Sequence, residues 1–221
     1  MKLTNYFVFI LAITAVLYMV DAMRWHYEPL ALNGIAMEPV IHLVNSSNYF
    51  GEEEQERSLR ELEAAVRKTM ILKEEISHKK SLELLDVSIP SILQLLNQPH
   101  TITSDELNDS CTKMLVALTY MQIHSATVSL ENEQYYDMKE SIGNAMYILK
   151  RALLIADGME RGHEVHIYSQ MAHLFENEVD AEESKQMLNL ILDELQYLEI
   201  SELQGIQVAD AESRQSSQAI N

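Results

Sequence analysis

Residues that interrupt or cross-link a chain are scarce in this sequence. Its 221 residues include only 6 glycines, 4 prolines and 1 cysteine. The single cysteine, Cys111, excludes an internal disulfide and any C-x-x-C redox or haem-attachment motif. Few glycines and prolines leave long stretches in which a helix can continue unbroken. Because no stretch alternates apolar and polar residues between turn signals, we expect an all-α protein without a substantial sheet.

Positive charge is also scarce. The chain has 16 lysines and arginines against 34 aspartates and glutamates, which gives a formal net charge of −18. Such a surface repels phosphate backbones and anionic lipid head groups, so nucleic acid is not expected as a partner. It suits a soluble protein, or one that meets basic peptides, cations or metals. The hydrophobic share of 47% is too high for a disordered chain.

Only one long apolar run occurs, and it lies near the N-terminus. Residues 6–20 are apolar apart from one threonine. This run is shorter than the roughly 20 residues that span a bilayer core, and it has the length of the apolar region of a signal peptide. Val20 and Ala22 would then occupy the small-residue positions before a cut preceding Met23. The pattern predicts a signal peptide over residues 1–22 and a periplasmic or otherwise exported protein.

The same run also fits an uncleaved membrane anchor. Residues 3–20 could cross the bilayer if the helix tilts or the bilayer thins. Arg24, Trp25 and Tyr27 would then lie at the membrane interface, where such side chains are enriched. In this alternative the rest of the chain is still outside the cytoplasm, as a membrane-anchored scaffold.

Three regions follow the leader. Residues 23–51 show weak periodicity and contain Pro29, Pro39 and a stretch of asparagine and serine, so we expect an irregular lead-in. Residues 52–204 have regular helical periodicity and form the expected helical domain. Residues 205–221 are polar and are expected to be a disordered tail.

Apolar residues recur at every third or fourth position in the helical domain, which is the period of one helix face. Short polar stretches separate these stripes, so neighbouring helices should lie antiparallel as hairpins. Two hairpins predict a four-helix-bundle-like core, and a third C-terminal hairpin follows. The expected helix pairs are 52–77 with 79–97, 107–128 with 135–156, and 165–175 with 187–198. In the first helix of the third pair, the expected core stripe is Val165, Tyr168, Ala172 and Phe175.

Several residues mark the ends of these helices. Thr103 and Glu106 have the spacing of a capping box. Pro90 lies inside a stripe and predicts either a kink or a restart capped by Ser88. The polar stretch 131–134 predicts a turn.

A histidine-rich stretch is the sharpest candidate for a metal site. His163, His166 and His173 lie within about 80° of one another around a helix. Imidazoles so placed could bind zinc, copper or nickel, and His124 from another helix could complete the set. The stretch has no H-E-x-x-H motif, and His166 and His173 are about 10 Å apart along the axis. The alternative is a set of exposed or edge histidines.

No motif for catalysis is present. The sequence has no nucleophile elbow and no glycine-rich phosphate loop. No Glu-x-x-His pair recurs on two helices, as a di-iron carboxylate site would require. The 12 methionines fit core filling better than a soft-metal or peptide-binding groove. We therefore expect neither enzyme activity nor a cofactor.

The segment from Leu62 to Pro99 contains Ala65 and Thr69, the charged turn His78-Lys79-Lys80, the helix Leu82 to Leu96, and Pro99. In these features it resembles the YfdX family of exported bacterial helical proteins. The segment from Ala172 to Leu195 is similar to a second such hairpin. The glycine usual in the family's turn is absent here. The resemblance implies a periplasmic, non-enzymatic, stress-associated protein with chaperone-like or ligand-binding behaviour, and it brings no catalytic residues.

These observations lead to one expected function and two alternatives. We expect an exported binding or interaction protein that holds a protein, peptide or small amphipathic ligand in an apolar groove between hairpins. The first alternative is a metal-binding helical bundle that uses His163, His166 and His173. The second is the membrane-anchored scaffold. The oligomeric state stays open.

Overall fold

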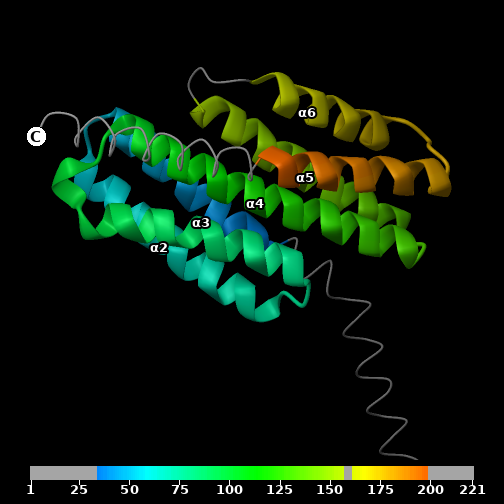
Figure 1. Ribbon diagram of the computed structural model, residues 1–221, viewed down its shortest axis with the longest axis horizontal. Coiled ribbons are helices and arrows are strands. Elements are labelled where there is room, and N and C mark those ends of the chain that lie inside the picture. Colours follow the sequence, from blue (N-terminus) through cyan, green and yellow to red (C-terminus); the bar gives the residue numbers. More distant parts are fainter. Residues whose placement is uncertain (1–33, 157–160, 199–221) are drawn as a thin grey trace, which may run out of the picture.

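The computed structural model describes residues 34–156 and 161–198, with side chains in the second range from Glu164 onward. Every regular element in these ranges is helical, which confirms the all-α prediction (Figure 1). The expected leader, residues 1–22, and the expected tail, residues 205–221, lie outside the described residues. The elements are a helix over residues 34–51, α2 (Gln55–Glu75), α3 (Lys79–Asn97), the short 3-10 helix η1 (Pro99–Thr101), α4 (Ser104–Glu131), α5 (Tyr135–Ile155), α6 (Arg161–Glu176) and a helix over residues 181–198.

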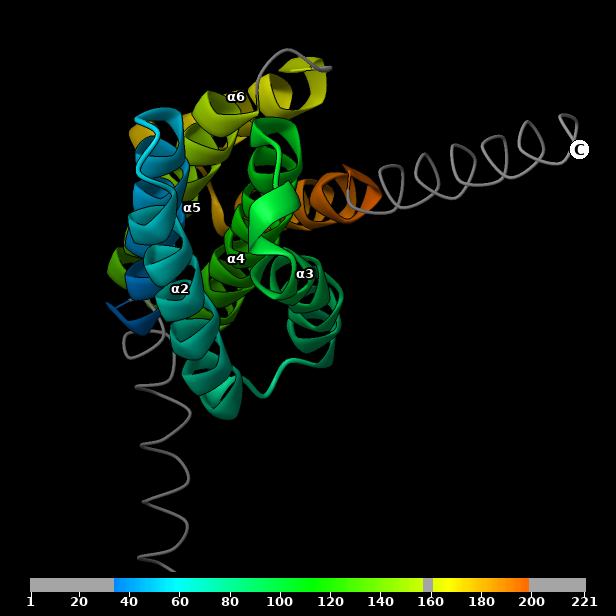
Figure 2. The same ribbon diagram turned by 90° about the vertical axis from the view of Figure 1, so that its left-hand side faces the viewer.

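Helix α4 is the centre of the bundle. It packs against both α3 and α5, and Figure 2 shows it between them. Every side chain from Ser110 to Ile123 is buried, so the helix is covered on all sides. The sequence explains this, because between Ser110 and Leu130 only Lys113 carries a full charge, and a helix without a polar face is a buried one. Lys113 is itself buried and pairs with Asp109 at 2.6 Å.

The bundle contains the expected antiparallel hairpins. Among α2 to α6, helices α4 and α5 share the most extensive interface, and they are joined by a tight turn in which Glu133 has a φ of 59°. The third hairpin, formed by α6 and residues 181–198, lies against the bundle (Figure 1). Helix α6 packs on α5, and Lys185 pairs with Glu131 at the end of α4 at 3.3 Å.

Residues 34–51 form a helix, so the expectation of an irregular lead-in there is wrong. Ala36, Val40 and Leu43 are fully buried and have helical spacing, which gives this helix a core face of its own. Pro39 lacks a backbone N–H, so it removes only one hydrogen-bond donor from the helix, and its ring is buried. The helix pairs with α2 through a short turn in which Glu53 has a φ of 62°.

The capping box at the start of α4 is confirmed. The Glu106 backbone N–H donates to Thr103 Oγ1 at 3.3 Å, and the Thr103 N–H donates to Glu106 Oε2 at 2.9 Å. Helix α3 runs through Pro90 without restarting, so of the two alternatives expected at Pro90 the restart capped by Ser88 is wrong. Pro90 lies on the exposed side of α3, where water can bind the backbone carbonyl that the proline leaves free. Ser88 is buried, and its hydroxyl donates to the Leu85 carbonyl at 3.3 Å.

No helix in the described ranges combines the length and the hydropathy needed to cross a bilayer.

Candidate functional site

One side of α5 carries large apolar side chains that face solvent. Tyr136, Tyr147 and Leu154 are 80%, 40% and 65% exposed. They follow one another at near-integral numbers of helical turns, so they share one side of the helix. The opposite side, which includes Met138 and Leu149, forms the core contact with α4. The side chains are separated along the helix, and Arg151 lies over the Tyr147 ring at 4.9 Å from its centroid. Apolar side chains gathered on one exposed side of a helix make that side a candidate for binding another molecule.

Phe175 of α6 extends this group of side chains. Its ring lies over Gly143 of α5, where an added Cβ atom would come within 3.2 Å of Phe175 Cε2. The ring is nevertheless 42% exposed. We call Tyr136, Tyr147, Leu154 and Phe175 together the α5 outer face. Glycine at position 143 lets the aromatic ring lie close to the helix backbone between Tyr136 and Tyr147.

A shallow hollow lies beside the first turn of α5. Its volume is about 260 Å³. It is lined by Tyr135, Met138, Lys139, Leu174, Asn177, Glu178, Val179 and Ser184. One wall is held in place by Lys139, whose ammonium donates to the carbonyls of Phe175 at 2.9 Å and Asn177 at 3.1 Å. Small-molecule pockets usually measure ~300–1,000 Å³, so this hollow suits a single apolar side chain of a partner.

The sequence stripe proposed for α6 is off by one position. Ile167, Met171 and Leu174 form its buried face, whereas Val165 and Phe175 are exposed. The two stripes are adjacent around the helix, and both contain apolar residues at helical spacing. Periodicity alone therefore could not identify which of them faces the core, and this error concealed the role of Phe175 at the surface.

A pair of stacked imidazoles joins the start of α3 to α4. The rings of His78 and His124 have centroids 3.5 Å apart and planes inclined by 16°. Tyr120 lies one turn before His124 on α4, and its ring is 6.2 Å from His78 at an inclination of 9°. His124, which could complete the metal candidate, stacks on His78, and among the described side chains it does not gather with His166 and His173 as metal ligands.

Burial favours the neutral form of both imidazoles. It lowers the pKa of His78, while the nearby Glu83 acts in the opposite direction. Burial, with a smaller contribution from His78, lowers the pKa of His124 to about 4, although Glu131 opposes the change. Both rings are therefore neutral at pH 7. No sequence motif links positions 78 and 124, so only the fold identifies this pair.

The histidines of the metal candidate are only partly described. His166 lies exposed on α6, with Nε2 2.9 Å from Gln170 Nε2 and 3.8 Å from Glu194 Oε1. His173 is also exposed, and its Nδ1 is 3.1 Å from Asn177 Nδ2. The side chain of His163 lies outside the described residues. Among the described side chains, no three histidine, cysteine or acidic residues gather as metal ligands. The three-histidine site stays a prediction.

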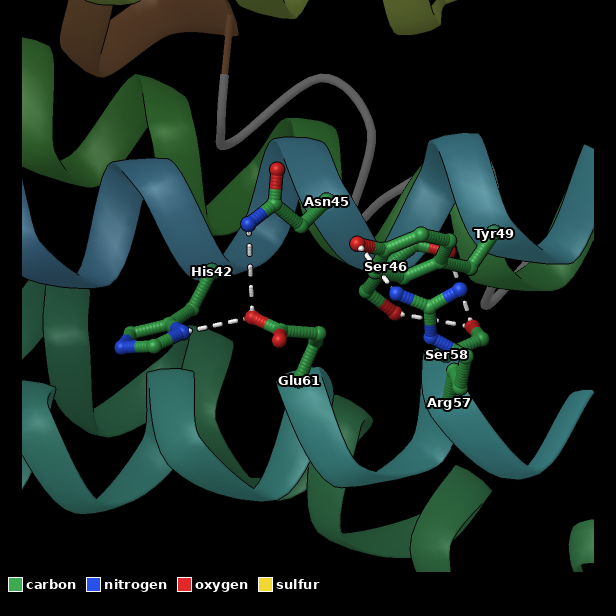
Figure 3. Close-up of polar contacts among 7 residues, drawn as sticks. All are labelled: His42, Asn45, Ser46, Tyr49, Arg57, Ser58 and Glu61. Carbon is green, nitrogen blue, oxygen red and sulfur yellow. Dashed lines mark hydrogen bonds and ion pairs between the residues drawn. The ribbon is translucent and has the colours of Figure 1, made fainter. Parts of the chain in front are cut away.

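A polar seam joins the helix of residues 34–51 to α2 (Figure 3). His42 Nδ1 lies 2.6 Å from Glu61 Oε2, and the hydroxyls of the buried Ser46 and Ser58 are 3.0 Å apart. Figure 3 shows the second imidazole nitrogen of His42 pointing away from both serines. The serines, His42 and Glu61 therefore do not form a relay for nucleophilic catalysis. Ser58 donates to the Ser46 carbonyl at 2.8 Å, and the seam serves to fasten the two helices.

Comparisons of the chain with protein-family models, with curated proteins and with solved structures find no match. The resemblance to the YfdX family stays a prediction.

Proposed function

We propose that this protein is a helical interaction protein that binds an apolar segment of a partner protein. The binding surface consists of the α5 outer face and the adjoining hollow. The observation that supports this most is the exposure of Tyr136, Tyr147 and Leu154 along one side of α5. Removing such side chains from water gives roughly 25 cal/mol per Å² of apolar area, and aromatic side chains supply the most area.

The partner's chemistry follows from the surface. An amphipathic helix places apolar side chains at intervals of three and four residues, so one such helix can lie along the α5 outer face. One of its side chains would enter the hollow as an anchor. The chain's net charge of −18 favours a partner with excess lysine and arginine, because opposite charges accelerate encounter.

The proposed setting is outside the cytoplasm. A signal peptide over residues 1–22, or an anchor over residues 3–20, supports export. The resemblance of residues 62–99 to the YfdX family supports a stress-associated, chaperone-like role, in which the partner is an exposed apolar segment of another protein. Retention of the leader would make the protein a membrane-anchored scaffold with the same binding surface.

Binding of a labelled synthetic helix tests the proposal. The probe is an amphipathic peptide of leucine and lysine, followed by fluorescence anisotropy with the full chain. The double variant Tyr136→Ser/Leu154→Ser should bind it at least about tenfold more weakly, which corresponds to ~1.4 kcal/mol. The matched control is Met70→Ser/Ile71→Ser on α2, whose side chains are 57% and 52% exposed. The control should bind as the parent does. Equal losses in both variants, or no binding by the parent, would reject the proposal.

The same preparation tests the metal alternative. Zinc that binds only the folded state must raise the melting temperature. If His163, His166 and His173 are the ligands, changing all three to alanine removes that rise. If zinc leaves the melting temperature of the parent chain unchanged, the three-histidine site is ruled out.

A further inference from the structure

The N-terminus of α3 lacks the usual stabilising charges. The first turn has no acidic residue and begins with Lys79 and Lys80, at the end where the helix dipole is positive. The side-chain cap comes from His78, whose Nδ1 accepts from the Ser81 backbone N–H at 3.4 Å. The same nitrogen is 3.0 Å from Ser81 Oγ. The start of α3 therefore depends on an imidazole that must be neutral at Nδ1 in order to accept.

The same imidazole attaches α3 to the central helix. His78 stacks on His124 with a centroid separation of 3.5 Å, and both rings are half-buried. Two imidazolium ions at this separation would repel each other strongly in a partly buried site. One contact thus combines a helix cap, an interhelical stack and two groups that cannot both be charged.

Charged and titratable groups surround the pair from each neighbouring element. On α3, Glu83 lies 3.5 Å from Lys79 Nζ and 3.6 Å from Lys80 Nζ, so much of its charge is already compensated. On α4, Glu131 acts on His124. From residues 181–198, Asp193 acts on Tyr120, which stacks beside His78. Glu83 favours the imidazolium form of His78 and Glu131 that of His124, but burial outweighs both carboxylates and holds the two histidine pKa values below their ordinary range.

We propose that His78 and His124 form an acid-sensitive latch, which holds the N-terminus of α3 on α4 while both rings are neutral and releases it when they are protonated. A proton on His78 Nδ1 removes the acceptor that caps α3. It also adds a positive charge beside Lys79 and Lys80 at the positive end of the helix. A second proton, on His124, separates the stacked rings. Release exposes the buried apolar side chains of the first turns of α3, including Leu84 and Leu85.

The direction of the pH effect follows from proton linkage. Between the ordinary histidine value of 6.5 and the lowered pKa of about 4 for His124, the released state binds more protons than the latched state. The contact between the N-terminus of α3 and α4 therefore weakens as the pH falls from 6.5 to about 4, and it is fully formed above this window. A protein outside the cytoplasm meets such acid directly, so the latch would couple external acidity to exposure of new apolar surface.

Hydrogen exchange measured by mass spectrometry on the full chain tests this inference. Amide protection over residues 79–88 is compared at pH 7 and pH 4.5, after correction for intrinsic exchange, with residues 142–152 of α5 as the internal reference. In the parent, protection over residues 79–88 should fall at least tenfold more than in α5. The variant His78→Asn/His124→Phe keeps a side-chain cap for α3 and an aromatic ring at position 124, although the stack between the two positions is lost. Neither new side chain can be protonated, so the extra loss should disappear.

Two further variants, His100→Gln and His78→Asn, complete the hydrogen-exchange test. His100→Gln removes an exposed histidine elsewhere and should behave as the parent does. His78→Asn alone, which retains His124, should reduce the extra loss and serves if the double variant does not fold. An equal acid-dependent loss in the parent and in the variants at positions 78 and 124, or no extra loss in the parent, would overturn the latch. Neither result bears on peptide binding at the α5 outer face.

Discussion

The aromatic ring of Phe175 lies over the backbone of Gly143, so that a Cβ atom there would be 3.2 Å from Phe175 Cε2. This contact joins α6 to the exposed side of α5 and completes the α5 outer face. Because the Phe175 side chain is 42% exposed, its ring can move toward solvent by a few tenths of an ångström. The surface proposed for binding is therefore partly adjustable.

Gly143→Ala should raise stability slightly. Alanine is favoured over glycine in a helix interior by about 1 kcal/mol, and the displaced Phe175 ring offsets part of this gain. We expect a net rise of roughly 0.5 kcal/mol in the free energy of unfolding in urea. The same variant should weaken peptide binding, because it moves Phe175 away from its place on α5. A destabilised variant would show that the ring is held rigidly.

Gln122→Leu should also stabilise the protein. Gln122 is fully buried in α4, and neither its amide nitrogen nor its amide oxygen has a hydrogen-bond partner. An unsatisfied buried polar group costs about 1–3 kcal/mol, and leucine removes both atoms while keeping most of the volume. Urea denaturation should show a gain in this range, whereas Gln122→Ala should lose stability through the cavity it creates. A destabilised leucine variant would mean that the amide binds something essential, such as an ordered water.

The free energy of unfolding should depend on pH through the protonation of His124. Its folded pKa of about 4 lies below the ordinary 6.5, so the unfolded chain binds more protons between these values. The free energy of unfolding should therefore decrease as pH falls through this window. In His124→Phe the decrease should be smaller, because phenylalanine retains the stack without a titratable group. Parallel stability curves for the two proteins between pH 7 and pH 4.5 would contradict this assignment.

Cys111 should be unreactive in the folded protein. The thiol is fully buried, and burial raises its pKa to about 12, so almost no thiolate is present at pH 8. A maleimide or disulfide reagent should modify it only after unfolding in urea. Rapid modification of the native protein at pH 8 would show that α4 opens more readily than its burial implies.

The sequence predicted most of the helices because local signals define them. The capping spacing of Thr103 and Glu106 and the turn at residues 131–134 are such signals, and both predictions were correct. The sequence does not predict the helix over residues 34–51, because weak periodicity, Pro39 and the stretch of asparagine and serine favour an irregular segment there. Its core residues nevertheless have helical spacing, which could have identified it.

The candidate sites were harder to predict because they depend on which helix faces meet. Phe175 belongs to one of two adjacent apolar stripes of α6, and only the packing on α5 decides between them. His78 and His124 are brought together by the docking of α3 on α4, which no local pattern specifies. The lack of charged residues from Ser110 to Leu130, apart from Lys113, is a local signal in the sequence that could have identified the central position of α4.

Mapping the bound leucine–lysine peptide by NMR tests the central claim most directly. The amide signals of the isotope-labelled chain would be followed during titration with the unlabelled peptide at pH 7. The account predicts shifts concentrated around Tyr136, Tyr147 and Phe175, with little change around Met70 on α2. Shifts centred on α2, or none at saturating peptide, would contradict the assignment of the α5 outer face as a binding surface.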